Sequence, residues 1–277
     1  MNILVTGNEG FIGKRLCQKL IEAGHTVEGF EYKENVLPDP SAYDWVIHLG
    51  AISSTTETDV EKIMNQNFEF TMQLINLCDQ FGVNLQYSSS AGVYGPLDKE
   101  KFKEDDPCLP KSPYAWTKYL IDRWLLGAGL ERGDFSVLIQ GFRYFNVYGP
   151  GEEHKGDQAS PLTKFEKQAK ETGIINIFEG SENYPRDFVH VDDVCDAHIQ
   201  MLNADTNGIY NVGTGKTESF ANIANWIAKK HDATVNTIPL PNNLQGQYQN
   251  YTCADITRLN KHVNKQWKTV KEYIDEQ

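Results

Sequence analysis

The sequence predicts an α/β fold, with a parallel sheet covered by helices on both faces, and three observations support this. Short apolar runs alternate with longer amphipathic stretches through the first half of the 277 residues, as expected for βαβ units. Glycines at positions 7, 10 and 13 directly follow the first apolar run. Residues 33–44 alone separate the second run from the third, and they include Pro38 and Pro40.

Each predicted element rests on its own pattern. The apolar run at 2–6 is typical of a buried parallel strand. Leu16 and Leu20 define the inner face of a helix that Gly24 ends. Ser112 and Pro113 are an N-cap and first-turn pair for a later helix. The full prediction is strands at 2–6, 27–32, 45–49, 84–88 and 136–142, and helices at 11–23, at 59–81 (ending at Gly82) and from 113 onward.

The gap between the second and third strands is unusually short. It lies at the lower limit for a parallel crossover, and its prolines disfavour a helix. Doubly wound dinucleotide-binding sheets place a further strand and helix here. We therefore expect a Rossmann-type doubly wound sheet shortened by one edge strand.

After Tyr148 the pattern loosens into a glycine-rich loop and then shorter fragments. We expect residues 1–149, together with about 187–212, to form a dinucleotide-binding domain. Residues of about 150–186 and 213–277 would form a smaller C-terminal substrate-binding lobe.

Composition excludes several classes of function. The net charge of −12 and the pI near 5.0 argue against nucleic acid, whose phosphates need clustered Lys and Arg. The five cysteines have no metal-ligand spacing, so we expect free thiols and no metal site. The sequence contains no apolar run of 18 residues, so we expect no membrane span. The first predicted strand follows Met1 directly, so we expect no signal peptide. We expect a cytoplasmic protein.

The glycine spacing predicts a bound dinucleotide, and together with Tyr114 and Lys118 it indicates a nicotinamide cofactor. Gly7 permits a tight turn, Gly10 lets the backbone approach a pyrophosphate, and Gly13 allows close packing of helix on strand. Glu31, with Tyr32 beside it at the end of the second strand, can accept hydrogen bonds from ribose hydroxyls. This favours NAD, whereas Lys33 could pair with the 2′-phosphate of NADP.

Tyr114 and Lys118 lie at i and i+4 and therefore project from one helix face. A nearby ammonium favours the phenolate form, so we expect Lys118 to lower the pKa of Tyr114. Ser90 would hydrogen-bond the substrate oxygen, with Ser88 and Ser89 as alternatives. Hydride transfer to a nicotinamide makes a carbonyl while a base takes the hydroxyl proton, and hydride return to the other face inverts the centre.

These residues resemble the extended short-chain dehydrogenase/reductase family of nucleotide-sugar enzymes. SSSAGVYG at 88–95 and RDFVHVDD at 186–193 carry the resemblance further. Within the family, several strings are similar to the ADP-L-glycero-D-manno-heptose 6-epimerase branch. They are SSTTE at 53–57, GFRYFNVYGP at 141–150, HKG at 154–156, FEGSEN at 178–183, RDF at 186–188 and the residues Tyr248, Gln249, Thr252, Ala254 and Asp255.

The resemblance implies roles for further residues. Lys155, in His-Lys-Gly, would be a second acid/base opposite the tyrosine and would also contact the cofactor. The cofactor would be lined by Phe11, Ile12, Leu49, Gly50, Ala51, Ser53, Asn67 and Val147. The substrate would be held by Asn146, Phe178, Glu179, Gly180, Ser181, Arg186 and Tyr248. Asp157 and Lys164 also stand at substrate positions, where the family has serine and histidine.

The leading interpretation is a nucleotide-sugar epimerase acting at C6 of an ADP-heptose, on a nucleotide-diphosphate sugar and within a homo-oligomer as the family usually assembles. The alternative is a 4-epimerase, dehydratase or reductase of the same family. Ala91 and Gly92 after Ser90 offer no carboxylic acid, which disfavours a dehydratase. A non-catalytic dinucleotide sensor is a different class, and it should lack Tyr114 or Lys118.

Overall fold

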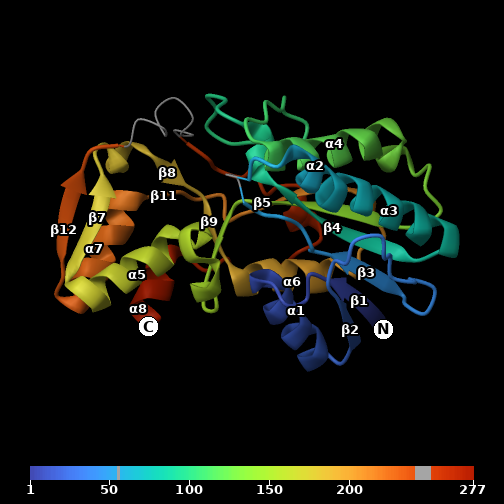
Figure 1. Ribbon diagram of the computed structural model, residues 1–277, viewed down its shortest axis with the longest axis horizontal. Helices are drawn as coiled ribbons and strands as arrows, with labels where there is room; N and C mark the ends of the chain where they lie inside the picture. Colours follow the sequence, from blue (N-terminus) through green and yellow to red (C-terminus); the bar gives the residue numbers. More distant parts are fainter. Residues whose placement is uncertain (55–56, 241–250) are drawn as a thin grey trace.

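The computed structural model describes residues 1–54, 57–240 and 251–277. Strands and helices alternate through the first half, and a smaller group of elements follows (Figure 1). The first half contains β1 (Asn2–Thr6), α1 (Phe11–Glu22), β2 (Thr26–Phe30), β3 (Trp45–His48), α2 (Val60–Ile63), a π-helical segment (Met64–Glu69), α3 (Phe70–Phe81), β4 (Asn84–Ser90), α4 (Pro113–Gly127) and β5 (Ile139–Tyr144). The second half contains β6 (Asn146–Tyr148), α5 (Pro161–Thr172), β7 (Ile174–Phe178), β8 (Pro185–Arg186), β9 (Phe188–His190), α6 (Val191–Met201), β10 (Gly208–Val212), β11 (Glu218–Ser219), α7 (Phe220–His231), β12 (Thr234–Ile238) and α8 (Val270–Glu276).

Six parallel strands form the central sheet, in the order β10-β5-β4-β3-β1-β2. The chain changes direction across the sheet between β1 and β3, which is the switch point where doubly wound sheets bind ligands. Within the described residues β2 pairs with β1 alone, and residues 31–44 lead directly to β3. The predicted Rossmann-type sheet, shortened by one edge strand, is confirmed.

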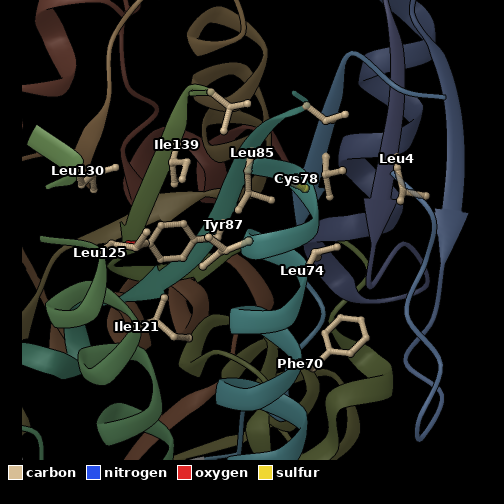
Figure 2. Close-up of a cluster of buried hydrophobic side chains, with 14 of the residues drawn as sticks. Leu4, Phe70, Leu74, Cys78, Leu85, Tyr87, Ile121, Leu125, Leu130 and Ile139 are labelled. Atoms are coloured by element: carbon tan, nitrogen blue, oxygen red, sulfur yellow. The ribbon is translucent and has the colours of Figure 1, made fainter. Parts of the chain in front are cut away.

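The two faces of the sheet carry separate apolar cores, as alternating side chains of parallel strands require. Ile3, Val5 and Ile47 pack against α1 and α6 on one face. On the other face the strands pack against α3 and α4, and Figure 2 shows Leu85, Tyr87 and Ile139 of the sheet meeting Leu74 and Cys78 of α3 and Ile121 and Leu125 of α4.

The predicted helix over 59–81 differs in its middle. Asp59 caps it by accepting a hydrogen bond from the backbone N–H of Lys62 (3.0 Å), and Gly82 ends it in the left-handed region (φ 72°). Between these ends Met64–Glu69 is π-helical. Such segments often occur at functional sites, and this one contains the fully buried Asn67.

Four of the five predicted strands have shifted ends. β3 stops at His48 rather than at 49, and β4 continues to Ser90 rather than ending at 88. β2 stops at Phe30 rather than at 32, and the hydrogen bond from the Gly7 N–H to the Phe30 carbonyl (2.9 Å) continues the pairing of β1 with β2 up to that residue. β5 covers 139–144 rather than 136–142. Ser136 is bound instead to Asp79 through its amide (2.9 Å) and its hydroxyl (2.7 Å). The predicted cap of α4 is confirmed, since Ser112 Oγ accepts the Ala115 N–H at 3.2 Å.

A further apolar core, outside the two faces of the sheet, lies among the elements on the left in Figure 1. Leu162 and Phe165 of α5, Ile227 of α7 and Ile274 of α8 meet there around Ile175 of β7. β10, by contrast, forms the far edge of the central sheet. Assignment of this second part to substrate binding stays a prediction. Across the described residues, no helix combines the length and apolarity that crossing a bilayer requires.

Candidate active site

The turn between β1 and α1 leaves no room for a side chain at Gly7 or at Gly13. Gly7 has a φ of +71°, and a Cβ there would lie 2.6 Å from the Gly50 Cα. A Cβ on Gly13 would lie 2.0 Å from the Gly7 carbonyl oxygen, and one on Gly10 would lie 3.2 Å from it. Gly7 and Gly13 are therefore needed for close approach of backbone to backbone, as the spacing predicts, whereas a side chain at Gly10 would be tightly packed.

Polar groups around this loop are available to a ligand. The amides of Phe11 and Ile12, in the first turn of α1, have no acceptor among the described residues. The buried Asn8 Oδ1 is an acceptor that receives no hydrogen bond from the part of the chain that the structure covers. A helix N-terminus with free N–H groups suits a phosphate, so the loop fits the pyrophosphate of a dinucleotide.

Glu31 follows β2 and is tied to the glycine loop. Its Oε1 accepts a hydrogen bond from the Glu9 N–H at 2.7 Å, which holds the exposed carboxylate beside the phosphate cradle. Tyr32 packs edge-on against Phe70, with ring centroids 5.4 Å apart. A cavity of about 660 Å³ opens beside them, lined by Tyr32, Glu34, Asn35, Val36, Leu37, Asn65, Glu69, Phe70 and Gln73.

The segment after β3 carries Leu49, Gly50, Ala51 and Ser53, all predicted to line the cofactor; we call residues 49–54 the strap. Asn67 holds the strap from behind. Its Oδ1 accepts the Ile52 N–H (2.8 Å), and its Nδ2 donates to the Ile52 carbonyl (3.0 Å). The sequence placed Asn67 among the cofactor contacts, and the structure directs its amide to the strap backbone.

Ser90, Tyr114 and Lys118 meet at the carboxyl end of β4. The phenol of Tyr114 lies close to the hydroxyl of Ser90, which lowers the pKa of the phenol, and Ser90 Oγ accepts the Gly92 N–H at 3.1 Å. Lys118 is 1% exposed, and its Nζ donates to Ser88 Oγ at 3.2 Å. The sequence-predicted triad is therefore brought together by α4 and β4, and Ser90, rather than Ser88 or Ser89, contacts the phenol.

The ionisation of this group differs from the expectation. Burial raises the pKa of Tyr114, and the nearby Ser90 hydroxyl offsets part of that rise. Burial also lowers the pKa of Lys118 to about 8, with the Asp122 carboxylate opposing the shift. In the protein alone, desolvation thus outweighs the expected effect of Lys118 on the tyrosine.

Lys155 lies in the loop after β6 and reaches the start of α1. Its Nζ lies 5.0 Å from the centroid of the Phe11 ring, at the start of α1, and 3.6 Å from Glu152 Oε2. Glu152 is fully buried and accepts the amides of Gly149 (3.1 Å) and Ser160 (2.7 Å), which closes the loop at both ends. The Glu152 carboxylate thus anchors the Lys155 loop, a role that was missed in the sequence.

The predicted substrate residues are distributed over several elements. Asn146 Nδ2 donates to the Asp187 carbonyl (2.9 Å) and to Thr252 Oγ1 (3.4 Å). Thr252 also pairs with Arg186 through the backbone, as an isolated β-bridge. The Arg186 guanidinium lies 5.6 Å from the Phe220 ring centroid. Asn146 and Arg186 therefore share one neighbour.

The other predicted positions are more scattered. Val147 is in β6, and Lys164 is in the first turns of α5. Phe178 ends β7, and the turn after it holds Glu179, Gly180 and Ser181, with Ser181 Oγ donating to the Phe178 carbonyl at 2.5 Å. Tyr248 and the side chain of Asp157 lie outside the described residues.

The comparison with known families matches this geometry. Residues 3–213 match the model of the NAD dependent epimerase/dehydratase family. The chain belongs to this family. Its fold is that of epimerases in the family, such as the ADP-L-glycero-D-manno-heptose-6-epimerase of Helicobacter pylori (TM-score 0.86, 24% identity, 99% of this chain and 94% of that one covered).

Two further structures are similar at slightly higher identity. The UDP-glucose 4-epimerase of Thermotoga maritima, solved with UDP-glucose, has a TM-score of 0.85 and 25% identity, and covers 99% of this chain and 98% of that one. The UDP-glucose 4-epimerase of Thermus thermophilus, solved with NAD, has a TM-score of 0.79 and 26% identity with the same coverage. The similar structures thus include epimerases that act at different carbons.

Behind the helix that carries Tyr114 lies a buried ion pair that was missed in the sequence. Asp122 is fully buried and accepts hydrogen bonds from Arg143 Nε (2.8 Å), Tyr87 OH (2.9 Å) and Ser89 Oγ (3.0 Å). Arg143 is 2% exposed and also donates to Tyr94 OH (2.9 Å). The pair fixes α4 of this epimerase/dehydratase family member to β4 and β5. An arginine inside the apolar run of β5 was the available signal.

Tyr144 is a second phenol close to Tyr114. It ends β5, pairs in register with Ser90, and hydrogen-bonds His198 Nε2 through its OH at 2.6 Å. His198 is fully buried, and its Nδ1 contacts Gln86 Oε1 at 2.7 Å. Burial lowers the pKa of His198 to about 3. The ring is therefore neutral where it hydrogen-bonds the hydroxyl of Tyr144.

Proposed function

We propose that this member of the NAD dependent epimerase/dehydratase family is a nucleotide-sugar epimerase, most specifically an ADP-glycero-manno-heptose 6-epimerase. The observation that carries the proposal is the position of Lys155 beside Phe11 at the start of α1, which offers a second candidate proton-transfer group in addition to Tyr114. Tyr114, beside Ser90, approaches from α4. Lys155 approaches from the loop after β6 and contacts Phe11. In the heptose 6-epimerases that the sequence resembles, the lysine of the His-Lys-Gly motif acts as a second acid/base, so Lys155 would serve the geometry opposite to that of Tyr114.

A nicotinamide dinucleotide, when bound, supplies transient oxidation and re-reduction of the sugar carbinol. Glu31 would accept hydrogen bonds from the adenosine ribose, which favours NAD. The phosphates would lie at the start of α1, and Lys118 would hydrogen-bond the nicotinamide ribose. The residues proposed to hold it are Gly7, Gly10, Phe11, Ile12, Gly13, Glu31, Tyr32, Leu49, Gly50, Ala51, Ser53, Asn67, Tyr114, Lys118, Val147 and Lys155.

The chain's own groups would handle the protons and the sugar. The Tyr114 phenolate would take the hydroxyl proton while Ser90 donates to the same oxygen. After the exocyclic side chain turns, Lys155 would give a proton to the oxygen in its new position. Arg186, whose planar fork matches a diphosphate, would hold the nucleotide with Asn146, Asp157, Lys164, Phe178, Glu179, Gly180, Ser181 and Tyr248.

A UDP-glucose-type 4-epimerase is the second candidate. The two 4-epimerase structures are 25% and 26% identical to this chain, against 24% for the heptose enzyme. The strings around Lys155 and 178–183 favour the heptose enzyme.

Two measurements separate the candidates. Small molecules released from the purified protein are identified by mass spectrometry, and NMR then follows ADP-heptose and UDP-glucose in parallel. We expect inversion at C6 of the heptose and none at C4 of glucose. Inversion of UDP-glucose alone would replace the first proposal by the second, and no turnover of either would reject both.

Variants test the roles of the two proton-transfer groups. Tyr114→Phe should abolish turnover and keep the cofactor, whereas Tyr119→Phe, on the same helix, should change neither. Lys155→Ala should slow epimerisation far more than cofactor reduction by a surrogate alcohol. The exposed Lys167→Ala serves as its control. Equal loss in both assays would indicate that Lys155 only binds substrate.

A further inference from the structure

His48, at the end of β3, is a buried titratable group that the proposed chemistry does not use. Its side chain is 1% exposed, and both ring nitrogens have partners. Nδ1 lies 2.6 Å from Thr6 Oγ1, and Nε2 lies 2.8 Å from Thr71 Oγ1. Thr6 and Thr71 are each 1% exposed, so the three side chains form a water-excluded chain.

The direction of this chain follows from its two ends. Thr71 Oγ1 donates its proton to the Asn67 carbonyl at 2.6 Å, so toward His48 it can only accept, and Nε2 must carry the ring proton. Nδ1 is then bare and accepts the Thr6 hydroxyl proton. The Thr6 oxygen in turn accepts the Gly50 N–H at 3.4 Å. One neutral tautomer satisfies every group.

The protonation state agrees with this assignment. Burial, together with the nearby Lys118 ammonium, lowers the pKa of His48 to about 3. A second proton, on Nδ1, would make the Thr6 oxygen an acceptor toward His48 and would leave the Thr6 hydroxyl proton without an acceptor among the described residues. The chain therefore depends on a neutral imidazole.

Both ends of this chain of hydrogen-bonded side chains reach residues of the candidate active site. Thr6 immediately precedes Gly7, and the strap at Gly50 packs directly on Gly7. At the other end Asn67 holds the Ile52 backbone and donates to Thr117 Oγ1 at 3.4 Å. Thr117 lies between Tyr114 and Lys118 and donates to the Tyr114 carbonyl at 2.7 Å. The chain thus joins the glycine loop, the strap, the π-helical segment and α4.

We propose that His48 is a positioning residue for the dinucleotide: it aligns the strap and the glycine loop with the helix that carries Tyr114 and Lys118. An ordinary core histidine would contribute to stability alone. This one holds the backbone on two sides of the cofactor cradle through hydroxyl groups. The inference rests on NAD use by the family, and it is independent of which sugar is turned over.

The first test removes single hydroxyl groups and measures affinity for NAD by calorimetry, after any retained nucleotide has been removed. Thr6→Val and Thr71→Val should each weaken NAD binding about tenfold, and Thr6→Ser, which keeps the hydroxyl, should restore it. His48→Gln cannot reach both threonines at the imidazole spacing and should weaken binding at least as much.

A stability-matched control separates positioning from folding. Leu74→Ala removes a fully buried side chain of α3 that is not hydrogen-bonded to Thr6, His48 or Thr71. It should lower the melting temperature at least as much as the threonine variants while leaving NAD affinity within about twofold. If the threonine variants behave as Leu74→Ala does, losing stability but not affinity, the proposal is overturned.

The second test needs no variant. ¹⁵N NMR of histidine-labelled parent protein should show a His48 ring with a protonated Nε2 and a bare Nδ1. The opposite tautomer, or an imidazolium at neutral pH, would reverse or break the chain and would reject the proposal. Because neither experiment uses a sugar, failure of the heptose assay and failure of this inference are distinguishable.

Discussion

Replacing Asp122 by asparagine should destabilise the protein more than most single substitutions, because it removes the charge of a buried ion pair and keeps its shape. The Asp122 carboxylate is fully buried and faces Arg143, which is 2% exposed. Asp122→Asn leaves a guanidinium without its counter-charge and places an amide N–H₂ among the donors of Arg143, Tyr87 and Ser89.

The size of the effect follows from that environment. Breaking a buried pair on one side costs about 3–5 kcal/mol, which corresponds to a fall in melting temperature of roughly 6–20 °C for a chain of this length. Urea unfolding followed by tryptophan fluorescence, together with calorimetry, measures both quantities. Asp134→Asn is the matched control, because the Arg132–Asp134 pair (2.7 Å) has both side chains about half exposed or more. It should cost less than about 1 kcal/mol.

The double variant Asp122→Asn/Arg143→Met completes the cycle. Its cost should fall below the sum of the single costs by about 1–3 kcal/mol, because no uncompensated charge remains. An Asp122→Asn variant within 1 kcal/mol of the parent, or additive single costs, would refute the view that this pair anchors α4.

Three further predictions concern the glycine loop, Glu31 and Lys118. Gly13→Ala should abolish NAD binding, because its Cβ would meet the Gly7 carbonyl at 2.0 Å, whereas Gly127→Ala, with open space around it, should bind normally; calorimetric titration compares them. Glu31→Ala should weaken NAD more than NADP, and a larger loss for NADP would mean that the carboxylate does not contact the ribose. Lys118 has a pKa lowered by burial from 10.5 to about 8, so the folded state bears the cost of the buried charge in full below pH 8. As pH rises from 7 to 10.5 that cost fades, and urea titrations should show the parent gaining about 3 kcal/mol relative to Lys118→Met; a constant difference would contradict the shift.

Local sequence patterns predicted the parts of the site that depend on neighbours along the chain. The glycine spacing, the Ser112 cap and the i, i+4 placement of Tyr114 and Lys118 all follow from short-range geometry. The missing edge strand was also visible, since residues 33–44 are too few for the usual crossover.

What escaped prediction depends on partners distant in sequence. Arg143 finds Asp122 across 21 positions, and Asn67 finds Thr117 across 50. The π-helical segment hardly alters the spacing of apolar residues along the helix, so the sequence pattern does not reveal it. Glu152 has its partners nearby, yet a glutamate in a polar loop carries no sign that folding will bury it completely.

The lost strand leaves β2 as the rim of the sheet, and an unpaired rim can recruit strands from other molecules. Here the rim has five residues, Glu28 is exposed along it, and Glu31 and Lys33 follow directly. A short ribbon with charged side chains is a poor template for edge-to-edge assembly. The protein can therefore do without its outermost strand and still resist fibrous aggregation.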